Sequence, residues 1–407
     1  MAATALLRAA RAADGAHVVV AGGGFGGATA AKYIRKWSGG AVRVTLVERE
    51  RAFVSCPLSN LVLSGARTID DLSVPYDGLE RWGVRRIAAE ARAIDPGARR
   101  LTLEDGATLA YDRLILSPGM DFDWEAIPGL ATPAARERVL HAWKAGPQTV
   151  ALRRQLEAMP DGGVFAMHVP LAPYRCPPAP YERACLVAQY FSAQKKRSKV
   201  IVLDANEDVQ AERALFLAAW NGPYRGYVDY RPNSGLVDVD AASLTAKLDF
   251  EDVKADVLNV IPPQRAGSIA RGAGMANAND RFCQVDFLTY ESTAQRNVHV
   301  LGDAIQPASL MPRSGHMANQ QAKVCASAVV ALLSGAEVNP QPIVTNTCYS
   351  YLSDRSVAHV ASVHRYDAAA KTMTVVAGSA GSSAAANEQE AAYAEAWARN
   401  IWADALG

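Results

Sequence analysis

The sequence predicts an α/β fold with two doubly wound parallel-sheet units and a separate C-terminal region. A strand-like apolar run, a glycine cluster and a helix-like segment follow one another over residues 17–37. Two further apolar runs, 164–167 and 199–204, keep the same strand-and-helix pattern later in the chain. Strands that alternate with helices form parallel sheets, and ligands bind at the carboxyl ends of such strands.

The composition of the 407 residues is that of an ordinary globular protein, with 50% hydrophobic and 20% charged residues. A net charge of +1 offers no basic field for nucleic acid. No apolar run reaches the roughly 18 residues of a membrane span, so we expect no transmembrane segment. The N-terminal stretch MAATALLRAARAADGA has no continuous apolar segment. This leaves open whether the protein is cytoplasmic or a signal was lost or mis-started.

The first predicted strand leads directly into a nucleotide-binding glycine motif. Gly22, Gly24 and Gly27 match G-x-G-x-x-G between a strand and a helix. The first glycine permits a tight turn, the second lets backbone N–H groups approach a pyrophosphate, and the third permits close helix packing. Glu48 ends the next strand, where its carboxylate would accept hydrogen bonds from an adenosine ribose. The segment therefore predicts a dinucleotide site.

The choice between FAD and NAD rests on later segments. TAQRNVHVLGD, residues 293–303, resembles the second FAD motif of glutathione-reductase-like flavoproteins. Its Asp303 would hold the ribityl chain, and Gly302 is a further expected cofactor-binding residue. YDRLILSPG, residues 111–119, resembles the strand and turn by which such domains return to the cofactor. We therefore expect two Rossmann-like domains of this flavoprotein type, with FAD as the cofactor.

These segments suggest a division of the chain. Residues 16–148 and 283–345 are expected to form a discontinuous FAD-binding domain. Residues 149–282 are expected to form the second Rossmann-like domain, without a nucleotide-binding glycine loop. Residues 346–407 would form a C-terminal region that covers the flavin and contributes to an interface.

The second unit carries RCPPAPYERAC, residues 175–185, where a second glycine loop would stand. Five prolines lie between positions 170 and 180. Proline has no backbone N–H, so this loop cannot form the N–H cradle that holds a pyrophosphate, and we expect no NAD(P)H site. Cys176 in this loop is either a structural thiol or a reactive group at the carboxyl end of a strand.

The motif RCPPAPYERA does not stand alone. Together with SCPLSN (55–60), IPPQRAG (261–267) and NTCYS (346–350), it closely resembles the flavoprotein subunit of flavocytochrome c sulfide dehydrogenase. The resemblance runs from residue 16 to the end of the chain. These motifs are far more specific than the glycine pattern.

The resemblance implies a role for each of several residues. Cys56 would bind the 8α-methyl group of FAD through a thioether, and Cys176 and Cys348 would form a redox-active disulfide at the flavin. Glu182 matches an acid near that disulfide, which would manage the proton of HS⁻, although an acid at a helix N-terminus is an equally good interpretation. Trp397 matches an aromatic residue close to the flavin.

The resemblance also implies the activity and the partners. Sulfide would attack the disulfide, two electrons would pass to FAD, and the product would be sulfur or polysulfide. A c-type cytochrome subunit would accept the electrons and would be a separate chain, because this one has no C-x-x-C-H. The expected location is the periplasm, and the cysteine and histidine spacing predicts no metal site.

Two other functions remain open from the sequence. A sulfide:quinone oxidoreductase shares the fold and the disulfide chemistry, but it reduces a membrane quinone. A flavin-binding redox sensor without turnover would not reduce its flavin with sulfide. A type II NADH dehydrogenase ranks lower, because it requires the missing glycine loop.

Overall fold

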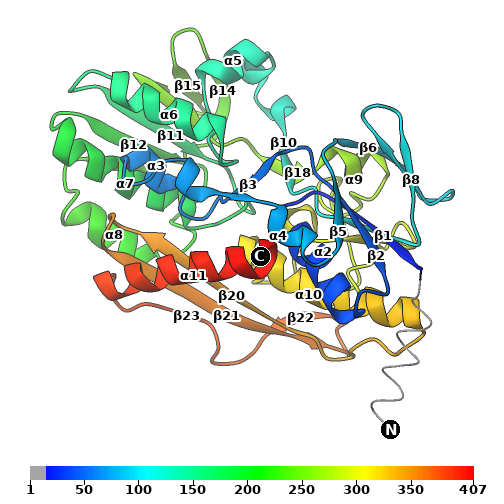
Figure 1. Ribbon diagram of the computed structural model, residues 1–407. Helices are drawn as coiled ribbons and strands as arrows, with labels where there is room; N and C mark the ends of the chain where they lie inside the picture. The colour runs from blue at the N-terminus through cyan, green and yellow to red at the C-terminus, as the bar shows by residue number, and fades with distance from the viewer. Residues whose placement is uncertain (1–14) are drawn as a thin grey trace.

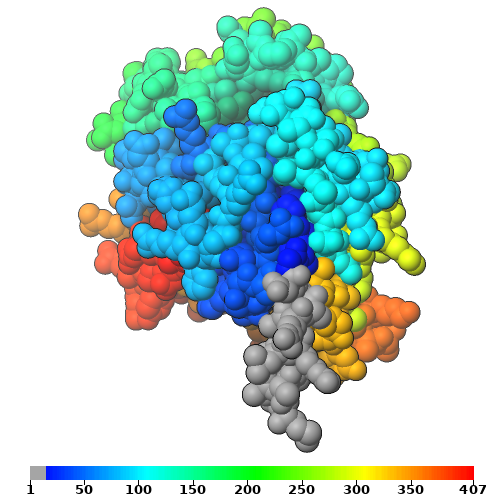
Figure 2. Space-filling model, turned by 45° about the vertical axis from the view of Figure 1, so that its right-hand side comes forward, coloured from blue at the N-terminus to red at the C-terminus, as the bar shows by residue number. Residues whose placement is uncertain are grey.

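The computed structural model describes residues 15–407, so residues 1–14, on which the question of a signal depends, lie outside the described residues. Figure 1 shows one parallel sheet on the right, a second at the upper left, and an antiparallel sheet with a long C-terminal helix along the bottom. In the space-filling view of Figure 2, the red C-terminal helix lies at the lower left beside blue residues of the first part.

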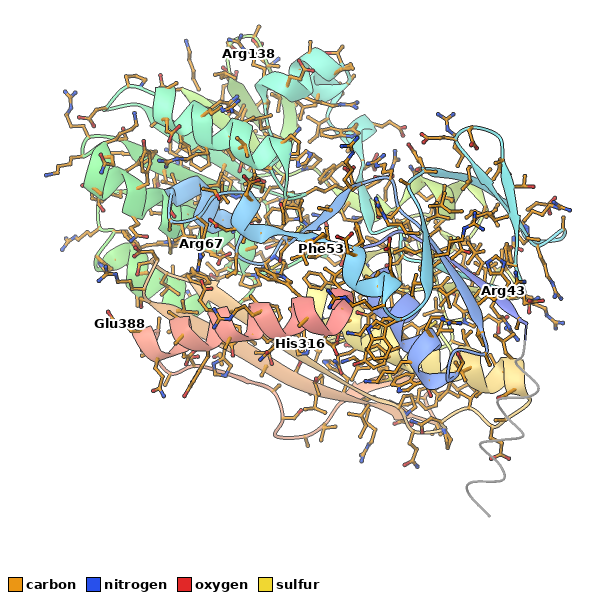
Figure 3. All side chains as sticks on the ribbon, in the orientation of Figure 1. Arg43, Phe53, Arg67, Arg138, His316 and Glu388 are labelled. Atoms are coloured by element: carbon orange, nitrogen blue, oxygen red, sulfur yellow. The ribbon has the colours of Figure 1, made fainter. Side chains whose placement is uncertain are left out.

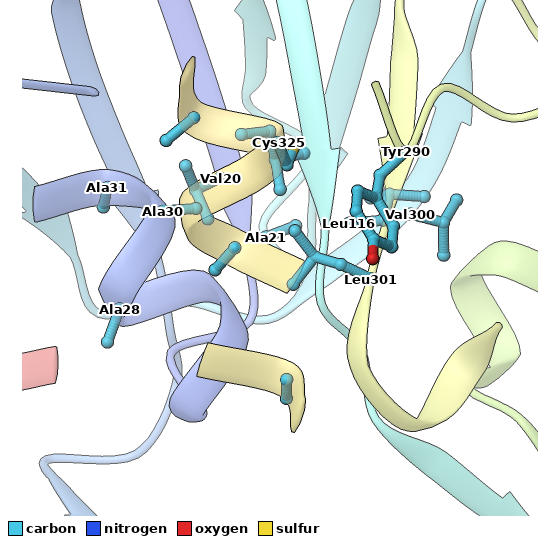
Figure 4. Packing of buried hydrophobic residues seen from close by; sticks show 14 of the residues in the cluster. Val20, Ala21, Ala28, Ala30, Ala31, Leu116, Tyr290, Val300, Leu301 and Cys325 are labelled. Carbon is cyan, nitrogen blue, oxygen red and sulfur yellow. The ribbon is translucent and has the colours of Figure 1, made fainter. Parts of the chain in front are cut away.

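The first sheet is wholly parallel and has five strands. Their spatial order is β19 (Val298–Val300), β9 (Arg113–Leu116), β1 (His17–Ala21), β2 (Arg43–Val47) and β5 (Val84–Ile87). Consecutive positions of β1 are buried, because helices and loops cover both faces of the sheet. Figure 4 shows α2 (Phe25–Trp37) beside α10 (Gly315–Ser334), with small side chains between them. Alanines on α2 allow this close packing.

The second sheet has four parallel strands. They are β13 (Val228–Arg231), β12 (Lys199–Asp204), β11 (Val164–Val169) and β17 (Val257–Val260), in that order. Alternate residues of β11 enter two different cores: Phe165 and Met167 pack with α6 (Pro147–Ala158) and α7 (Ala179–Gln194), whereas Ala166 packs on the other face. The continuous apolar sequence of β11 follows from this burial on both faces.

The C-terminal region holds an antiparallel sheet that the sequence did not predict. It comprises β20 (Ile343–Tyr351), β21 (Val357–Asp367), β22 (Thr372–Val375) and β23 (Gly381–Ser382). The expected helix is present as α11 (Glu388–Leu406) and lies along this sheet. Lys32 of α2 donates to the carbonyls of Ala403 and Asp404 at 2.9 and 3.0 Å, which fixes the end of α11 to the first part.

Shorter elements complete the fold. The antiparallel strands are β10 (Met120–Phe122) with β18 (Gln264–Ala266), β3 (Ala52–Val54) with β4 (Ser73–Pro75), β6 (Ala91–Asp95) with β7 (Arg100–Leu103) and β8 (Thr108–Ala110), and β14 (Leu236–Asp240) with β15 (Thr245–Leu248) and β16 (Asp252–Lys254). The remaining helices are α3 (Asn60–Ser64), α4 (Asp77–Glu80), α5 (Pro133–Arg138), α8 (Arg213–Asn221), α9 (Ser268–Gly272) and the 3₁₀ turns η1 (Asp70–Leu72), η2 (Trp124–Ala126), η3 (Pro128–Leu130) and η4 (Gly302–Ala304).

The predicted α/β class with two parallel sheets is therefore confirmed. The division into domains stays a proposal. The suggested boundary at residue 346 falls within β20, which begins at Ile343.

Candidate active site

A cavity of about 80 Å³ lies where the starts of α3, α7 and α10 meet β20 and the middle of α11. Five residues named from the sequence line it: Cys56, Cys176, Glu182, Cys348 and Trp397. Further lining side chains include Asn60, Arg175, Arg183, Ser314, His316 and Tyr349. The fold thus brings together chemically versatile residues from segments far apart in the chain.

The first cavity cysteine, Cys176, sits in the proline loop between β11 and α7. Its φ of 55° is left-handed, and its N–H donates to the carbonyl of Arg313 at 2.9 Å. Burial, and then the neighbouring Cys348 and Glu182, raise the pKa of the Cys176 thiol well above its usual value. All six cysteines are free thiols in the structure.

The second cavity cysteine, Cys348, lies on β20. Asn346 Nδ2 donates to its sulfur at 3.4 Å. Burial raises the pKa of Cys348 to about 11, while the polar groups of Asn346 and Ser314 oppose that rise. The two cysteines thus share a cavity but differ in the polar groups that reach their sulfurs.

Glu182 lies in the first turn of α7 and is buried. Its carboxylate accepts hydrogen bonds from Asn60 Nδ2 at 2.7 Å and from the Tyr351 N–H at 3.1 Å. Burial raises the pKa of Glu182 to about 7 despite these bonds. A carboxyl that titrates near neutral pH beside two cysteines is suited to proton transfer.

Arg183, the next residue, is also buried and turns to the other side of Asn60. It donates to Asn60 Oδ1 at 3.0 Å, to Asn259 Oδ1 at 2.8 Å and to the carbonyls of His141 and Ala142. Burial lowers the pKa of Arg183 to about 9. Asn60 therefore joins an acid and a base through the two ends of one amide group.

Cys56 follows β3 in the loop that leads to α3. The guanidinium of Arg175 lies within hydrogen-bonding range of its sulfur and 3.8 Å from Asp303 Oδ2. Burial opposes the charge of Arg175, but Cys56 and Asp303 outweigh it and raise the pKa of the arginine. Arg175 thus connects the predicted attachment cysteine with the predicted ribityl-binding acid.

Aromatic side chains form the wall of the cavity on the side of α11. The ring of Trp397 meets His316 and Tyr349, each at a centroid distance of 5.8 Å. His316, labelled in Figure 3 beside α11, accepts a hydrogen bond from the Thr347 N–H at 2.9 Å. A second, open pocket of about 430 Å³ lies on the far side of these three residues.

The glycine motif after β1 fits a dinucleotide. A Cβ on Gly22 would lie 2.3 Å from the Ser117 carbonyl, and one on Gly27 would lie 1.8 Å from the Gly22 carbonyl, whereas one on Gly24 would meet nothing. Gly24 is the N-cap of α2 and supplies no side-chain acceptor, so the helix N-terminus is available to an anion. Glu48 Oε2 accepts from the Gly23 N–H at 2.6 Å, which places the carboxylate at this turn.

The second FAD segment also fits. Gly302 has a φ of +77° and begins η4, with Asp303 next to it. Arg313 is buried nearby, and its pKa is lowered to about 10 by burial despite the opposing charge of Asp303. Among residues 15–407, Arg313 Nε has no hydrogen-bond partner, which suits a site that receives a polar cofactor group.

The corresponding turn of the second sheet is closed. Asp204 ends β12, as Glu48 follows β2, but it is fully buried. Its carboxylate accepts hydrogen bonds from Tyr181 at 2.8 Å, from Tyr230 at 3.0 Å and from Asn206 Nδ2 at 2.7 Å. Protein hydroxyls and an amide therefore occupy the positions where ribose hydroxyls would bind.

Some site residues were missed from the sequence. Asn60 and Asn346 stand inside the recognised motifs SCPLSN and NTCYS, and Asn346 is two residues from Cys348, so the alternation of a strand would have put both on one face. Glu212 had no such signal. Its Oε2 accepts a hydrogen bond from Ser350, and burial raises its pKa.

Comparison with known sequences identifies the family of this chain. A family described as "Sulfide dehydrogenase [flavocytochrome c] flavoprotein chain, central" matches residues 149–262, and "Flavocytochrome c sulphide dehydrogenase, flavin-binding" matches residues 340–406. The flavoprotein chain of this dehydrogenase from Chlorobaculum thiosulfatiphilum is 62% identical over 46 residues, which are 94% of that sequence and 11% of this chain. This chain belongs to the flavocytochrome c sulfide dehydrogenase flavoprotein family. It is therefore an oxidoreductase of that family, and the flavin-binding match supports FAD as its cofactor.

Members of this family share their fold with other flavoproteins. Residues 16–157 match the family "Pyridine nucleotide-disulphide oxidoreductase". The mitochondrial sulfide:quinone oxidoreductase of Dictyostelium discoideum is 23% identical over 304 residues, covering 70% of this chain but only 64% of that protein. The structure of the sulfide:quinone oxidoreductase from Aquifex aeolicus superposes with a TM-score of 0.76 at 17% identity, covering 96% of this chain and 91% of the other. The structural likeness concerns the fold.

Residues 15–407 contain neither a membrane-spanning helix nor a cluster of metal-binding side chains. None of the helices there combines the length and the apolar character needed to cross a membrane. In the same residues, no group of three or more histidine, cysteine or acidic side chains could hold a metal ion.

Proposed function

We propose that this flavoprotein oxidises sulfide through a disulfide between Cys176 and Cys348, passes two electrons to FAD and then delivers them to a c-type cytochrome subunit. The supporting observation is that Cys56, Cys176, Cys348 and Glu182 line one cavity although they come from separate segments. When bound, FAD would accept an electron pair and release the electrons one at a time.

The residues of the cavity have distinct proposed roles. HS⁻ attacks one sulfur of the oxidised pair, and the other cysteine leaves as a thiolate. Glu182, with a pKa raised by burial to about 7, takes up and returns the proton of the substrate sulfur. Arg175, which lies in the cavity with the cysteines, draws the anion into the site.

The FAD sites are proposed from the fit described above. Gly24 leaves room for the pyrophosphate at α2, Gly22 and Gly27 permit the close packing of this turn, and Glu48 faces the ribose. Gly302 and Asp303 hold the ribityl chain, Trp397 lies against the flavin ring, and Cys56 forms the thioether. For the thioether, flavin that stays with acid-precipitated protein is the expected result, and flavin in the supernatant would rule it out.

One experiment tests the activity. Anaerobic protein is mixed with sulfide while the flavin absorbance is followed, and we expect the flavin band to bleach. An unchanged spectrum would favour a non-turnover flavin redox sensor. Adding oxidised cytochrome c or a quinone to separate samples then identifies the acceptor, because only the true acceptor restores the oxidised spectrum rapidly.

A sulfide:quinone oxidoreductase is the second candidate. It is favoured by the similarity to proteins of that name and by the open pocket beyond Trp397. We rank it below the cytochrome-linked enzyme because two family matches carry the flavocytochrome c description. The closed position at Asp204 supports the proposal that NAD(P)H is not used. A periplasmic location is proposed with the cytochrome partner, and cell fractionation tests it.

A further inference from the structure

The sulfur of Cys348 stands at the end of a fixed chain of hydrogen bonds. Asn346 Nδ2 donates to Cys348 Sγ at 3.4 Å, and Asn346 Oδ1 accepts from Ser314 Oγ. The protonated thiol also donates to Oδ1 at a longer 3.7 Å, a contact that the thiolate cannot make. Ser314 is itself fixed as the N-cap of α10, where its Oγ accepts the Met317 N–H at 3.0 Å. Asn346 and Ser314 are both buried, so water does not compete for these contacts.

The backbone also holds this donor in place. Asn346 and Cys348 are two residues apart on β20, and both are in register with β21 through Ser362 and Val360. The paired strand thus fixes the backbone of Asn346, and the helix cap Ser314 fixes the oxygen of its side-chain amide. A donor that is oriented before reaction stabilises developing negative charge without reorganisation.

Cys176 has no comparable donor. Across residues 15–407, no hydrogen bond to its sulfur is present, and burial, Cys348 and Glu182 all disfavour its anion. Arg175 partly opposes them and stands where it would attract an approaching HS⁻. The anion of Cys348 is disfavoured by Glu212 and Glu182 and favoured by Asn346 and Ser314.

We propose that Asn346 is a positioning residue that makes Cys348 the departing thiolate, so that the sulfur of sulfide is added to Cys176. This inference rests on the proposed disulfide mechanism. HS⁻ forms an S–S bond to Cys176 while the Cys176–Cys348 bond breaks. In this step the bonding pair leaves on Cys348, the proton remains on the added sulfur until Glu182 takes it up, and the single negative charge moves from HS⁻ to Cys348. The step needs no oxidant beyond the disulfide.

The first test measures the thiol of Cys348 without sulfide. In the Cys176→Ser background, the rate of Cys348 alkylation by iodoacetamide is followed by peptide mass spectrometry as a function of pH. Asn346→Asp keeps the size of the side chain and an acceptor for Ser314, but it replaces the donor with a carboxylate oxygen. We expect about tenfold slower alkylation near neutral pH, because a rise of one pKa unit reduces the thiolate fraction tenfold.

Two further variants make this test specific. Asn277→Asp carries the same change at an exposed site outside the cavity and should leave the rate unchanged. Ser314→Ala should also slow the alkylation, but by less, because it removes the hydrogen bond that orients the Asn346 amide. This variant keeps the test available if Asn346→Asp does not fold. Equal alkylation rates with Asn, Asp and the Ser314 variant would overturn the role of Asn346.

The second test locates the transferred sulfur. Anaerobic wild-type protein is mixed with one equivalent of sulfide, quenched with iodoacetamide and digested, and the peptide with the added sulfur is identified. We expect it on Cys176, and finding it on Cys348 would overturn the assigned direction. Absence of flavin bleaching in the same sample would instead count against the proposed function. The alkylation rate of Cys348, which is measured without sulfide, would still test the role of Asn346.

Discussion

At the carboxyl end of the first sheet, the turn after β1 consists of glycines beside open space. At the equivalent place in the second sheet, the turn after β11 consists of prolines and packed side chains. A Cβ on Gly24 would meet nothing within 4 Å, whereas Tyr181 fills the second site and is fully buried. The acid at the strand end is present in both units, but Glu48 lies at an open turn and Asp204 is enclosed by tyrosines. The same architecture thus has an open turn in one unit and a closed turn that carries Cys176 in the other.

The largest expected effect is at the two cavity cysteines, Cys176 in the second unit and Cys348 on β20. Cys176→Ser and Cys348→Ser should each abolish bleaching of the flavin by sulfide while FAD stays bound, because neither variant can form the disulfide. Anaerobic absorbance spectra measure this directly. Cys325→Ala, at a buried position of α10, is the control outside the cavity and should bleach as the wild type does. Normal bleaching in either serine variant would disprove the disulfide mechanism.

The first unit should respond to a change at its open turn. Gly24→Ser fills space that only a bound pyrophosphate would occupy, and serine is itself a favoured N-cap, so folding should change by less than about 0.5 kcal/mol. Flavin content of the purified protein should nevertheless fall severalfold. Gly27→Ala gives the contrast, because its Cβ would meet the Gly22 carbonyl and should destabilise the fold itself. Full flavin content in Gly24→Ser would place the pyrophosphate elsewhere.

Glu182 provides a pH-dependent test at the junction of the two units. Its pKa is raised from 4.5 to about 7 in the folded protein, chiefly by burial, with Glu212 adding to the rise and Asn60, Tyr351 and Arg183 opposing it. The folded state therefore binds the proton more tightly. The stability from this group is complete below the unfolded pKa and is lost as the pH rises through about 7, on the order of 3 kcal/mol in total.

Glu182→Gln cannot titrate, so its stability should lack this loss. Urea unfolding of both proteins over a pH series measures the difference, which should shift in favour of the variant as the pH rises. A difference that stays constant with pH would mean that Glu182 has the same pKa in the folded and unfolded protein. The sulfide-driven bleaching rate of the variant should also lose its dependence on a group near neutral pH.

The sequence predicted the parts of this contrast that depend on local patterns. Apolar runs and glycines identified both sheets and the first turn, and prolines excluded an N–H cradle from the second. The antiparallel sheet of the C-terminal region was missed, because the notable features of that segment were its cysteine motif and its final helix. Asn60, Asn346 and Glu212 were missed because their importance comes from tertiary contacts. Asn60, for example, bridges Glu182 and Arg183 from a helix more than one hundred positions away.

The smallest expected effect concerns the enclosed acid of the second unit. Tyr181→Phe removes one of the donors to Asp204 and leaves a buried carboxylate oxygen less satisfied, which should lower the free energy of unfolding by about 1 to 2 kcal/mol. Tyr227→Phe, in the same unit, removes a hydroxyl that makes no hydrogen bond within residues 15–407 and should cost less than about 0.5 kcal/mol. Denaturant unfolding compares the two.

NADH should reduce the flavin of neither variant, because the proline loop still lacks the N–H groups of a pyrophosphate site. Flavin reduction by NADH in Tyr181→Phe alone would mean that the tyrosine, and not the loop, closes the second site.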